Sequence, residues 1–299
     1  MSVDAHHHVW DLSVRDQDWI TGPELQPLRR NFTLADLEPE ARAAGFDRTI
    51  LVQTITVPEE TPEFLALAEE SELVAGVVGW TDLTRPDVAD ELARLRELPG
   101  GRYLKGIRHQ VQGEPDPEWL LRADVRRGLA AVAEAGLVYD LVVVPHQLTA
   151  CVKAAASLPE LTFVLDHLGK PPIASGEREP WASDVRALAA LPNTVCKLSG
   201  MVTEAAPAAW TTDTLRPYAD TVLEAFGPGR LMFGSDWPVC TLAATYGQVA
   251  AIAGELTAGL GSGESEAVFS GTAARVYGIC PTPPSGPSRV ARAGGGGAP

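Results

Sequence analysis

The sequence predicts an α/β protein of the (β/α)8 TIM-barrel class, built as a single domain. Eight short apolar runs alternate with longer stretches of helical pattern in a chain of 299 residues. Strict alternation of strand and helix favours parallel strands, for which a doubly wound open sheet is the competing arrangement. The count of eight strands, at a length typical of such barrels, favours the closed barrel.

The predicted elements follow one another regularly. The strands are residues 3–8, 49–53, 74–80, 103–108, 138–144, 162–167, 194–199 and 231–236. The helices are residues 34–44, 62–72, 88–97, 123–135, 147–157, 181–191 and 214–226, with 242–256 and 264–277 completing the outer ring. Local signals support them: Thr33 with Asp36 resembles a capping box, Pro62 suits a first helical turn, and Gly45 and Gly136 suit helix C-caps.

The end of the chain differs in composition from the rest. Proline-rich and then glycine-rich sequence begins at residue 281 and offers little apolar surface to bury. We therefore expect the barrel to span residues 1–279 and a disordered Pro/Gly-rich tail to span residues 280–299.

Composition and charge exclude several classes of partner. The chain has 24 basic and 39 acidic residues, a formal charge of -15 that repels nucleic acid and anionic membranes. It has neither an apolar stretch long enough to span a bilayer nor room for a signal peptide, so we expect a cytoplasmic protein with a small-molecule partner. Its four dispersed cysteines are predicted to be reduced thiols, and the oligomeric state is left undefined.

An H-x-H pair, His6 and His8, ends the first predicted strand. Side chains alternate along a strand, so these two imidazoles point to one side while His7 points to the other. Such a pair suits a metal ion or a polarised carbonyl oxygen. The alternative, a purification-tag remnant, is disfavoured because a tag usually has six histidines and is not followed by Val9-Trp10-Asp11.

Unusual polar and aromatic residues gather at the carboxyl ends of the predicted strands, where barrel enzymes place their chemistry. Beyond His6 and His8 they are Gln53, Trp80, Asp82, Arg108, His109, His146, His167, Lys170, Lys197, Ser199, Asp236 and Trp237. All six histidines of the chain therefore fall at one predicted rim, which indicates a site there.

The strongest candidates of this set are His167, Asp236 and Arg108. His167 could be a hydrogen-bonded structural histidine, but its position favours the site. Asp236 could cap the following segment, yet opposite His6 and His8 it is better explained as a metal ligand, a general base, or both. Arg108 could form a surface ion pair, but at the rim its planar guanidinium would hold oxygen atoms of a substrate.

Four further residues at this rim are candidate substrate contacts: His109, His146, Trp80 and Trp237. Lys105 lies three positions before Arg108, so both cannot face inward from a regular strand, and Lys105 is expected to be structural. By the same alternation, Asp166 next to His167 is expected to face away from the barrel axis, and Lys197 is a weak candidate. Neither a phosphate-binding loop nor a nucleophilic-serine motif is present.

Four segments together resemble the amidohydrolase superfamily, in the amidohydrolase-2 branch that includes L-fuconolactonases and 2-pyrone-4,6-dicarboxylate lactonase. The matching segments are residues 4–10 (DAHHHVW), 105–109 (KGIRH), 165–171 (LDHLGKP) and 233–238 (FGSDWP). They occur in the expected order across nearly the whole chain, and residues 271–277 (GTAARVY) are similar to the closing helix of that family.

The resemblance implies a TIM barrel that hydrolyses a lactone in carbohydrate catabolism, with His6, His8, His167 and Asp236 at its centre. These four residues suit one divalent ion such as Zn²⁺, although the branch contains both metal-dependent and metal-independent lactonases. A two-metal site is not expected, because Lys105 is badly placed for the bridging lysine and His146 lies beyond its strand.

The expected reaction opens a sugar-derived aldonolactone. Asp236 would take a proton from water that attacks the ester carbonyl, while His6, His8 and His167, directly or through a metal ion, stabilise the oxyanion. Arg108 would orient ring oxygens or hydroxyls, and Trp80 or Trp237 could pack against the sugar. The alternatives are a decarboxylase or an amide hydrolase on the same barrel, or a non-catalytic barrel that binds a sugar acid.

Overall fold

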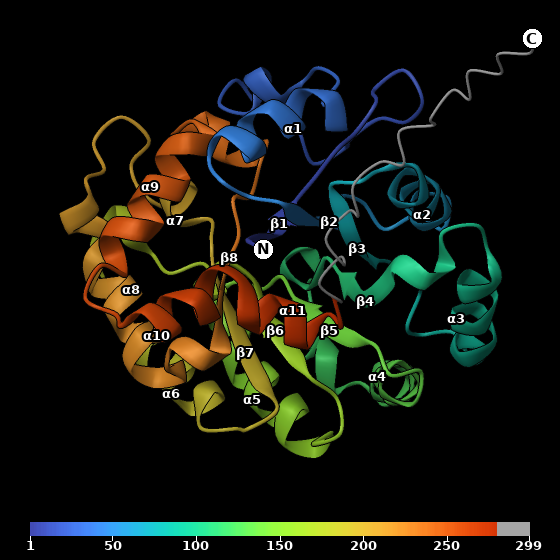
Figure 1. Ribbon diagram of the computed structural model, residues 1–299. Coiled ribbons are helices and arrows are strands. Elements are labelled where there is room, and N and C mark those ends of the chain that lie inside the picture. The colour runs from blue at the N-terminus through green and yellow to red at the C-terminus, as the bar shows by residue number, and fades with distance from the viewer. Residues whose placement is uncertain (280–299) are drawn as a thin grey trace, which may run out of the picture.

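The computed structural model describes residues 1–279, and the tail predicted over residues 280–299 lies outside the described residues. Eight parallel strands pair in chain order from β1 to β8, and an isolated bridge between His7 and Trp237 joins the first strand to the segment just after the last. Figure 1 looks onto one end of this barrel and shows the helices arranged around it. The predicted single-domain (β/α)8 barrel is confirmed.

The strands occupy the positions predicted for them, with shorter carboxyl ends in several cases. Their bounds are β1 Val3–His7, β2 Arg48–Val52, β3 Val74–Gly79, β4 Leu104–His109, β5 Val138–Leu141, β6 Phe163–Leu165, β7 Thr194–Leu198 and β8 Leu231–Phe233. Strands β6 and β8 end earlier than predicted because the chain turns into left-handed conformations at His167 and Asp236. Both turns lie at the candidate site.

The helices also follow the prediction. Their bounds are α1 Leu34–Ala43, α2 Glu60–Glu70, α3 Val88–Glu97, α4 Ala123–Glu134, α5 Leu148–Ser157, α6 Trp181–Ala189, α7 Met201–Glu204, α8 Thr212–Phe226, α9 Tyr246–Leu256, α10 Ser262–Glu266 and α11 Thr272–Val276. The capping box of Thr33 and Asp36 is present, whereas the predicted helix over residues 264–277 is interrupted by a π-helical turn, Ala267–Gly271. The short helix α7 was not predicted.

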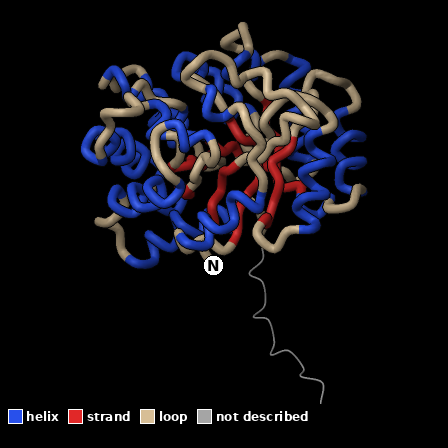
Figure 2. The backbone as a smooth tube through the Cα atoms, turned by 90° about the horizontal axis from the view of Figure 1, so that it is seen from above, coloured by secondary structure: helices blue, strands red, loops and turns tan. Residues whose placement is uncertain are grey.

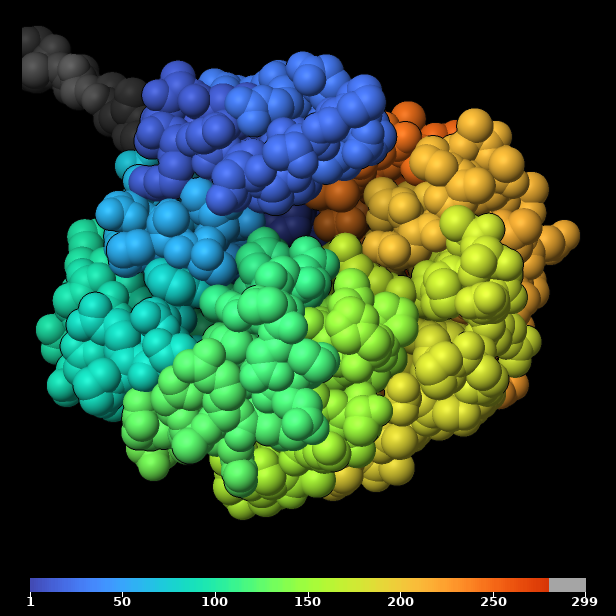
Figure 3. Space-filling model, turned by 180° about the vertical axis from the view of Figure 1, so that it is seen from behind, coloured from blue at the N-terminus to red at the C-terminus, as the bar shows by residue number. Residues whose placement is uncertain are grey.

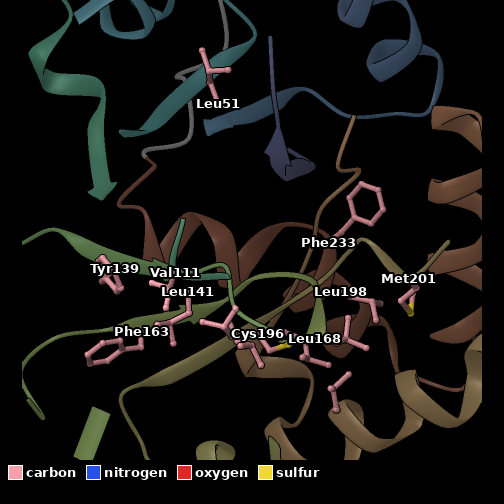
Figure 4. Close-up of a cluster of buried hydrophobic side chains, with 14 of the residues drawn as sticks. Leu51, Val111, Tyr139, Leu141, Phe163, Leu168, Cys196, Leu198, Met201 and Phe233 are labelled. Carbon is pink, nitrogen blue, oxygen red and sulfur yellow. The ribbon is translucent and has the colours of Figure 1, made fainter. Parts of the chain in front are cut away.

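Two apolar layers hold the barrel together. The larger lies between the strands and the surrounding helices, and Figure 4 shows part of it, including Tyr139, Phe163 and Leu198 from neighbouring strands. The smaller fills the inside of the barrel, where Val164 and Met232 meet Tyr277 and Ile279 from the end of the described chain. Cys151, Cys196 and Cys240 are buried and form no disulfide, while Cys280 lies outside the described residues.

The two ends of the barrel therefore differ. Residues at and just beyond α11 close one end from inside, whereas loops gather at the other, as the side view in Figure 2 shows. Figure 3 looks onto this second end and shows a hollow with dark-blue atoms of the N-terminal strand at its floor. Within the described residues, no helix is long and apolar enough to cross a membrane.

Candidate active site

Four side chains from three strand ends converge at the mouth of the barrel. The Nε2 atoms of His6 and His8 are 3.1 Å apart. Oδ1 of Asp236 lies 3.8 Å from Nε2 of His6, 3.6 Å from Nε2 of His8 and 3.8 Å from Nε2 of His167. The structure thus brings together the four residues that the sequence analysis placed at the centre, and we refer to them as the histidine–aspartate centre.

An irregularity in β1 aims His6 and His8 into the barrel. The pairing of β1 with β2 shifts by one residue between Asp4 and His7. Ala5 belongs to the apolar cluster inside the barrel, and His6 next to it also faces inward, which regular alternation would not allow. His7 faces the other way and bonds the Thr49 hydroxyl at 2.9 Å, as predicted for the middle histidine.

The backbone at His167 and at Asp236 is left-handed. Within residues 1–279, positive φ values of non-glycine residues occur at His167, Leu168, Lys170 and Asp236, with φ between 52° and 58°. This conformation costs a residue with a Cβ atom roughly 1–2 kcal/mol. Strain of this kind persists where the surrounding structure enforces it, commonly at functional sites.

Two glycines make room for the histidines. A Cβ atom at Gly200, whose φ is +67°, would lie 2.7 Å from Nδ1 of His167, and one at Gly234 would lie 2.8 Å from Cβ of His6. Both contacts are far too close for any residue with a side chain. Strands β7 and β8 therefore approach the two imidazoles as backbone alone, which fixes the position of the rings.

The second ring nitrogens of the histidines are held by neighbouring groups. Nδ1 of His8 lies 2.8 Å from the carbonyl oxygen of Val52, which can only accept, so Nδ1 carries the proton and the Nε2 lone pair faces the centre. Nδ1 of His167 bonds the Ser199 hydroxyl at 2.9 Å. Partners of this type orient imidazoles that bind metal ions.

Burial keeps the imidazoles of His6 and His167 uncharged. Desolvation lowers the pKa of His167 to about 4 and that of His6 well below its ordinary value. Burial alone would raise the pKa of Asp236, but its interactions with His167 and His8 and the positive charge of Lys170 bring it below its usual value. At neutral pH the centre therefore offers imidazole lone pairs and a carboxylate.

This donor set fits one divalent metal ion. Ligand atoms of His6, His167 and Asp236 all lie within 4.8 Å of one another, and His8 adds a fourth donor 3.1 Å from His6. Bonds of ~2.0–2.1 Å in a tetrahedron place neighbouring ligands about 3.4 Å apart, close to the 3.1–3.8 Å found here. Three neutral imidazoles and a carboxylate are ligands that Zn²⁺ accepts.

A network of buried charges lies against His6, deeper in the barrel. Nζ of Lys197 lies 2.5 Å from Oδ2 of Asp140, 2.9 Å from Oδ1 of Asp166 and 3.2 Å from Nδ1 of His6. Nη1 of Arg108 lies 2.9 Å from Oδ2 of Asp166. Each ion thus has an opposite charge within contact, a condition for keeping charges buried.

Asp166 corrects one prediction from the sequence. It was expected to face away from the barrel axis, yet its carboxylate is fully buried between Arg108 and Lys197 and lies 3.4 Å from Nδ1 of His6. The expectation failed because it extended the sixth strand to His167. The strand ends at Leu165, and the left-handed turn that follows lets both Asp166 and His167 reach the interior.

The Arg108 side chain makes more hydrogen bonds to the protein than its predicted role in substrate binding requires. Its guanidinium donates to the side chain of Gln53 at 2.9 Å, to the Gln53 carbonyl, and to Asp166, and the residue is 3% exposed. It joins β4 to the end of β2 across β3. Contact with a substrate through its remaining N–H group stays a prediction, whereas its structural role is evident.

The aromatic residues lie on the other side of the mouth, over β3 and β4. The indole N–H of Trp80 donates to Nδ1 of His109 at 3.0 Å, and Nε2 of His109 lies 2.7 Å from Glu114. The His109 ring also stacks on Trp119, with ring centres 4.2 Å apart. Both ring nitrogens of His109 are therefore engaged, while Trp80 remains partly exposed.

The remaining two predicted substrate contacts are placed less favourably. His146 lies on an exposed turn, Pro145–Gln147, and no hydrogen bond or ring contact joins it to the histidine–aspartate centre in the described part of the chain. The Trp237 ring is 2% exposed and packs edge-on against Phe32. Roles in substrate binding stay predictions for both.

Sequence reasoning missed some of the site. Asp140 was not considered, although an aspartate inside an otherwise apolar strand of 138–144 was a usable signal. Tyr277 donates from its hydroxyl to Asp140 at 2.9 Å, and Glu204 pairs with Lys170 at 3.4 Å. These last two contacts join segments distant in sequence, so no local pattern pointed to them.

A barrel whose mouth gathers three neutral histidines and an aspartate has the architecture of a TIM-barrel hydrolase. The family model described as amidohydrolase matches residues 3–279, and the chain belongs to the amidohydrolase family. The resemblance inferred from four short segments is thereby confirmed.

Characterised and solved relatives agree with this assignment. An L-fucono-1,5-lactonase of Burkholderia multivorans is 39% identical over 290 residues, covering 93% of this chain and 96% of that protein. Two crystal structures of an amidohydrolase from B. multivorans, one with bound HEPES and one with bound zinc, are 38% identical. They match with TM-scores of 0.88 and 0.87 and cover 94% of this chain and 100% of theirs.

Proposed function

We propose that this protein is a lactonase that opens a sugar-derived aldonolactone with the help of one divalent ion, Zn²⁺ being the best match. The observation that carries the proposal is the position of Asp236, whose Oδ1 lies within 3.8 Å of three histidine Nε2 atoms. The 39% identity to an L-fucono-1,5-lactonase and the zinc in a solved relative support the substrate class and the ion.

The centre has the groups that ester hydrolysis requires. His6, His8, His167 and Asp236 would hold the ion, which when bound would act as a Lewis acid in the hydrolysis of the ester. Asp236 is ionised at neutral pH, since its pKa stays below the ordinary value despite burial, so it can accept a proton. Its second carboxylate oxygen leaves capacity for that proton while Oδ1 faces the histidines.

In the proposed reaction Asp236 takes up one proton and later releases it. Water adds its oxygen to the lactone carbonyl carbon and gives a proton to Asp236. The tetrahedral species collapses, the bond between the carbonyl carbon and the ring oxygen breaks, and the ring oxygen leaves as an alkoxide. Asp236 returns the proton to this oxygen, which yields the open hydroxy acid and restores the carboxylate.

The rest of the mouth would position the sugar. Trp80 is partly exposed and its indole is fixed by His109, so it offers a rigid face to the apolar side of a ring. Arg108 retains one N–H group on Nη2, besides the N–H groups that bond Gln53, Asp166 and Nε2 of His6. Direct contacts of His109, His146 and Trp237 with substrate stay predictions.

The test is proton release from a panel of L- and D-aldonolactones and pyrone dicarboxylate, corrected for spontaneous opening. We expect wild type to open one stereochemical group of aldonolactones. Asp236→Asn should lose about 10²-fold or more of this activity, the usual contribution of a general base, while it remains folded. Wild-type rates in the variant would refute the role of Asp236. Silence across the panel, with release of CO₂ or of an amine from other substrates, would favour the decarboxylase or amide-hydrolase alternatives.

The charge and the helices of the chain bear on its cellular location and its partners. The described residues contain no helix that could cross a membrane, and the formal charge of -15 disfavours binding to nucleic acid. We infer a cytoplasmic enzyme whose partner is a small lactone.

A further inference from the structure

An ion pair stands at the mouth of the barrel on the same side as the histidine–aspartate centre. Lys170 follows β6 and Glu204 ends the short helix α7 after β7, and Nζ of Lys170 lies 3.4 Å from Oε1 of Glu204. Their side chains are 25% and 27% exposed. In residues 1–279 neither side chain makes another hydrogen bond, so two ammonium N–H groups and one carboxylate oxygen remain available.

The pair lies beside two residues of the centre. Lys170 closes the turn that contains His167, and its backbone N–H bonds the His167 carbonyl at 2.8 Å. Helix α7 also contacts the turn Val239–Leu242, which follows Asp236. A molecule bound at Asp236 would therefore meet Lys170 and Glu204 with its neighbouring atoms.

The backbone at Lys170 adopts an unfavourable conformation that places its side chain beside Glu204. Lys170 has a left-handed backbone, with φ 52° and ψ 62°, at the end of the turn that begins at His167, and its N–H bonds the His167 carbonyl at 2.8 Å. A lysine is not suited to this conformation. Ion pairs with this exposure add little to stability, so stability alone does not explain the arrangement.

We propose that Lys170 and Glu204 form a hydroxyl-binding subsite, in which the ammonium donates to one hydroxyl of the lactone ring and the carboxylate accepts from its neighbour. The ring carbonyl lies at Asp236 meanwhile. This inference rests on the proposed lactonase function and narrows it to neutral, polyhydroxylated lactones. A substrate with a carboxylate at this position would be repelled by Glu204.

The experiment compares two six-membered lactones that differ in hydroxyl groups. One is the hydroxylated aldonolactone that wild type opens best, and the other is δ-valerolactone, which carries none. Lys170→Met and Glu204→Gln should each lower kcat/KM for the hydroxylated lactone about 10- to 100-fold, as expected for loss of a hydrogen bond to a charged group. The same variants should change kcat/KM for δ-valerolactone less than about 3-fold, because their field on Asp236 alone is a modest contribution.

The inhibition constant of a polyhydroxylated δ-lactam against the hydroxylated lactone gives a second readout that does not need turnover of δ-valerolactone. It should rise by a similar factor in both variants, whereas the constant of unsubstituted δ-valerolactam should not change. The matched control is the pair of Lys153 and Glu118, 3.0 Å apart and more than half exposed, which joins α5 to the turn before Trp119. Lys153→Met and Glu118→Gln should behave as wild type in every assay.

Two results would overturn the subsite. Equal losses on both lactones would mean that Lys170 and Glu204 act on Asp236 and not on hydroxyls, and kinetics like those of the Lys153 control would mean that they do not act at all. A wild type that opens none of the lactones would instead refute the proposed function itself, so the two failures are distinguishable.

Discussion

The inside of the barrel divides into two halves that are built from the same strands. The lower half lies towards the amino ends of the strands, and the upper half lies towards their carboxyl ends, where the histidine–aspartate centre is. In the lower half Val138, Val164 and Val195 pack against Tyr277 in an apolar cluster. Two residues further along β5, on β7, and just after β6, the same inward face carries Asp140, Lys197 and Asp166. One step along each strand thus changes the interior from packing to charge. Apolar packing in the lower half stabilises the fold, so the upper half can hold buried charged groups that would not stabilise it by themselves.

The upper half remains folded because its charges satisfy one another. The ammonium of Lys197 contacts two carboxylates and His6, and Arg108 binds Asp166. Burial alone would raise the pKa of Asp166, but Lys197, His6 and Arg108 hold it well below the usual value. Removing one member leaves the others buried and unpaired, so mutations in the two halves should differ in kind.

The largest effect is expected from Asp166→Asn in the upper half. The change leaves Arg108 and Lys197 short of a counter-charge and should lower the free energy of unfolding by about 3–5 kcal/mol, the usual cost of breaking a buried pair. It should also weaken metal binding, because Nδ1 of His6 loses the carboxylate beside it. Urea denaturation and zinc competition with a chelator measure the two effects. A stable variant with unchanged zinc affinity would show that the network does not support the centre.

Met232→Ala should be nearly as costly to stability but silent in function. Met232 is fully buried in the lower cluster, where truncation leaves a cavity and costs about 2–5 kcal/mol. Zinc affinity and kcat per folded molecule should stay within about twofold of wild type at a temperature where the variant is folded. Met232→Leu is the volume-matched control and should cost less than about 1.5 kcal/mol. A specific loss of zinc in Met232→Ala would break the division between the halves.

Acid should destabilise the metal-free protein through the upper half. Burial lowers the pKa of His167 to about 4, against 6.5 for the ordinary residue. Between pH 6.5 and 4 the unfolded chain gains a proton at this position and the folded chain does not, so stability falls as the pH drops. The shift corresponds to about 3 kcal/mol over this window. Denaturation at several pH values in the presence of a chelator measures this dependence of the free energy of unfolding on pH. Met232→Ala should show the same slope as wild type at a lower overall stability. A free energy of unfolding that does not change between pH 6.5 and 4 would contradict the inference that His167 is buried and neutral.

The smallest effect is expected where the halves meet. Tyr277, near the end of the described chain, donates its hydroxyl to Asp140 at 2.9 Å. Tyr277→Phe keeps the ring in the lower cluster and removes this bond, so thermal unfolding should show a loss of about 1–2 kcal/mol. Turnover should change little, because Lys197 still holds Asp140. A tenfold fall in kcat would mean that the lower end of the barrel controls the centre.

The sequence was a sufficient guide wherever a local pattern carried the information. Strand positions followed from eight apolar runs, and the histidine–aspartate centre followed from residues at strand ends, since parallel strands in a barrel bring those ends together. His6 and His8 were predicted to point the same way from alternation, and they do.

The failures have a different physical origin. Asp166 was placed on the wrong side because its strand was read two residues too long, and left-handed turns of non-glycine residues leave no clear sequence signal. Tyr277 and Glu204 act through contacts with residues far away in the chain. Such contacts depend on the closed barrel, which a single sequence describes only indirectly.

We propose that the upper half of the barrel holds one metal ion, which lactone opening requires. The direct test is to titrate Zn²⁺ into chelator-treated, full-length protein while following proton release from the best aldonolactone. We expect no activity above the spontaneous rate at the start and a linear rise that saturates at about one equivalent per chain, the capacity of a single mononuclear site. Full activity without metal, or saturation at two equivalents, would contradict it.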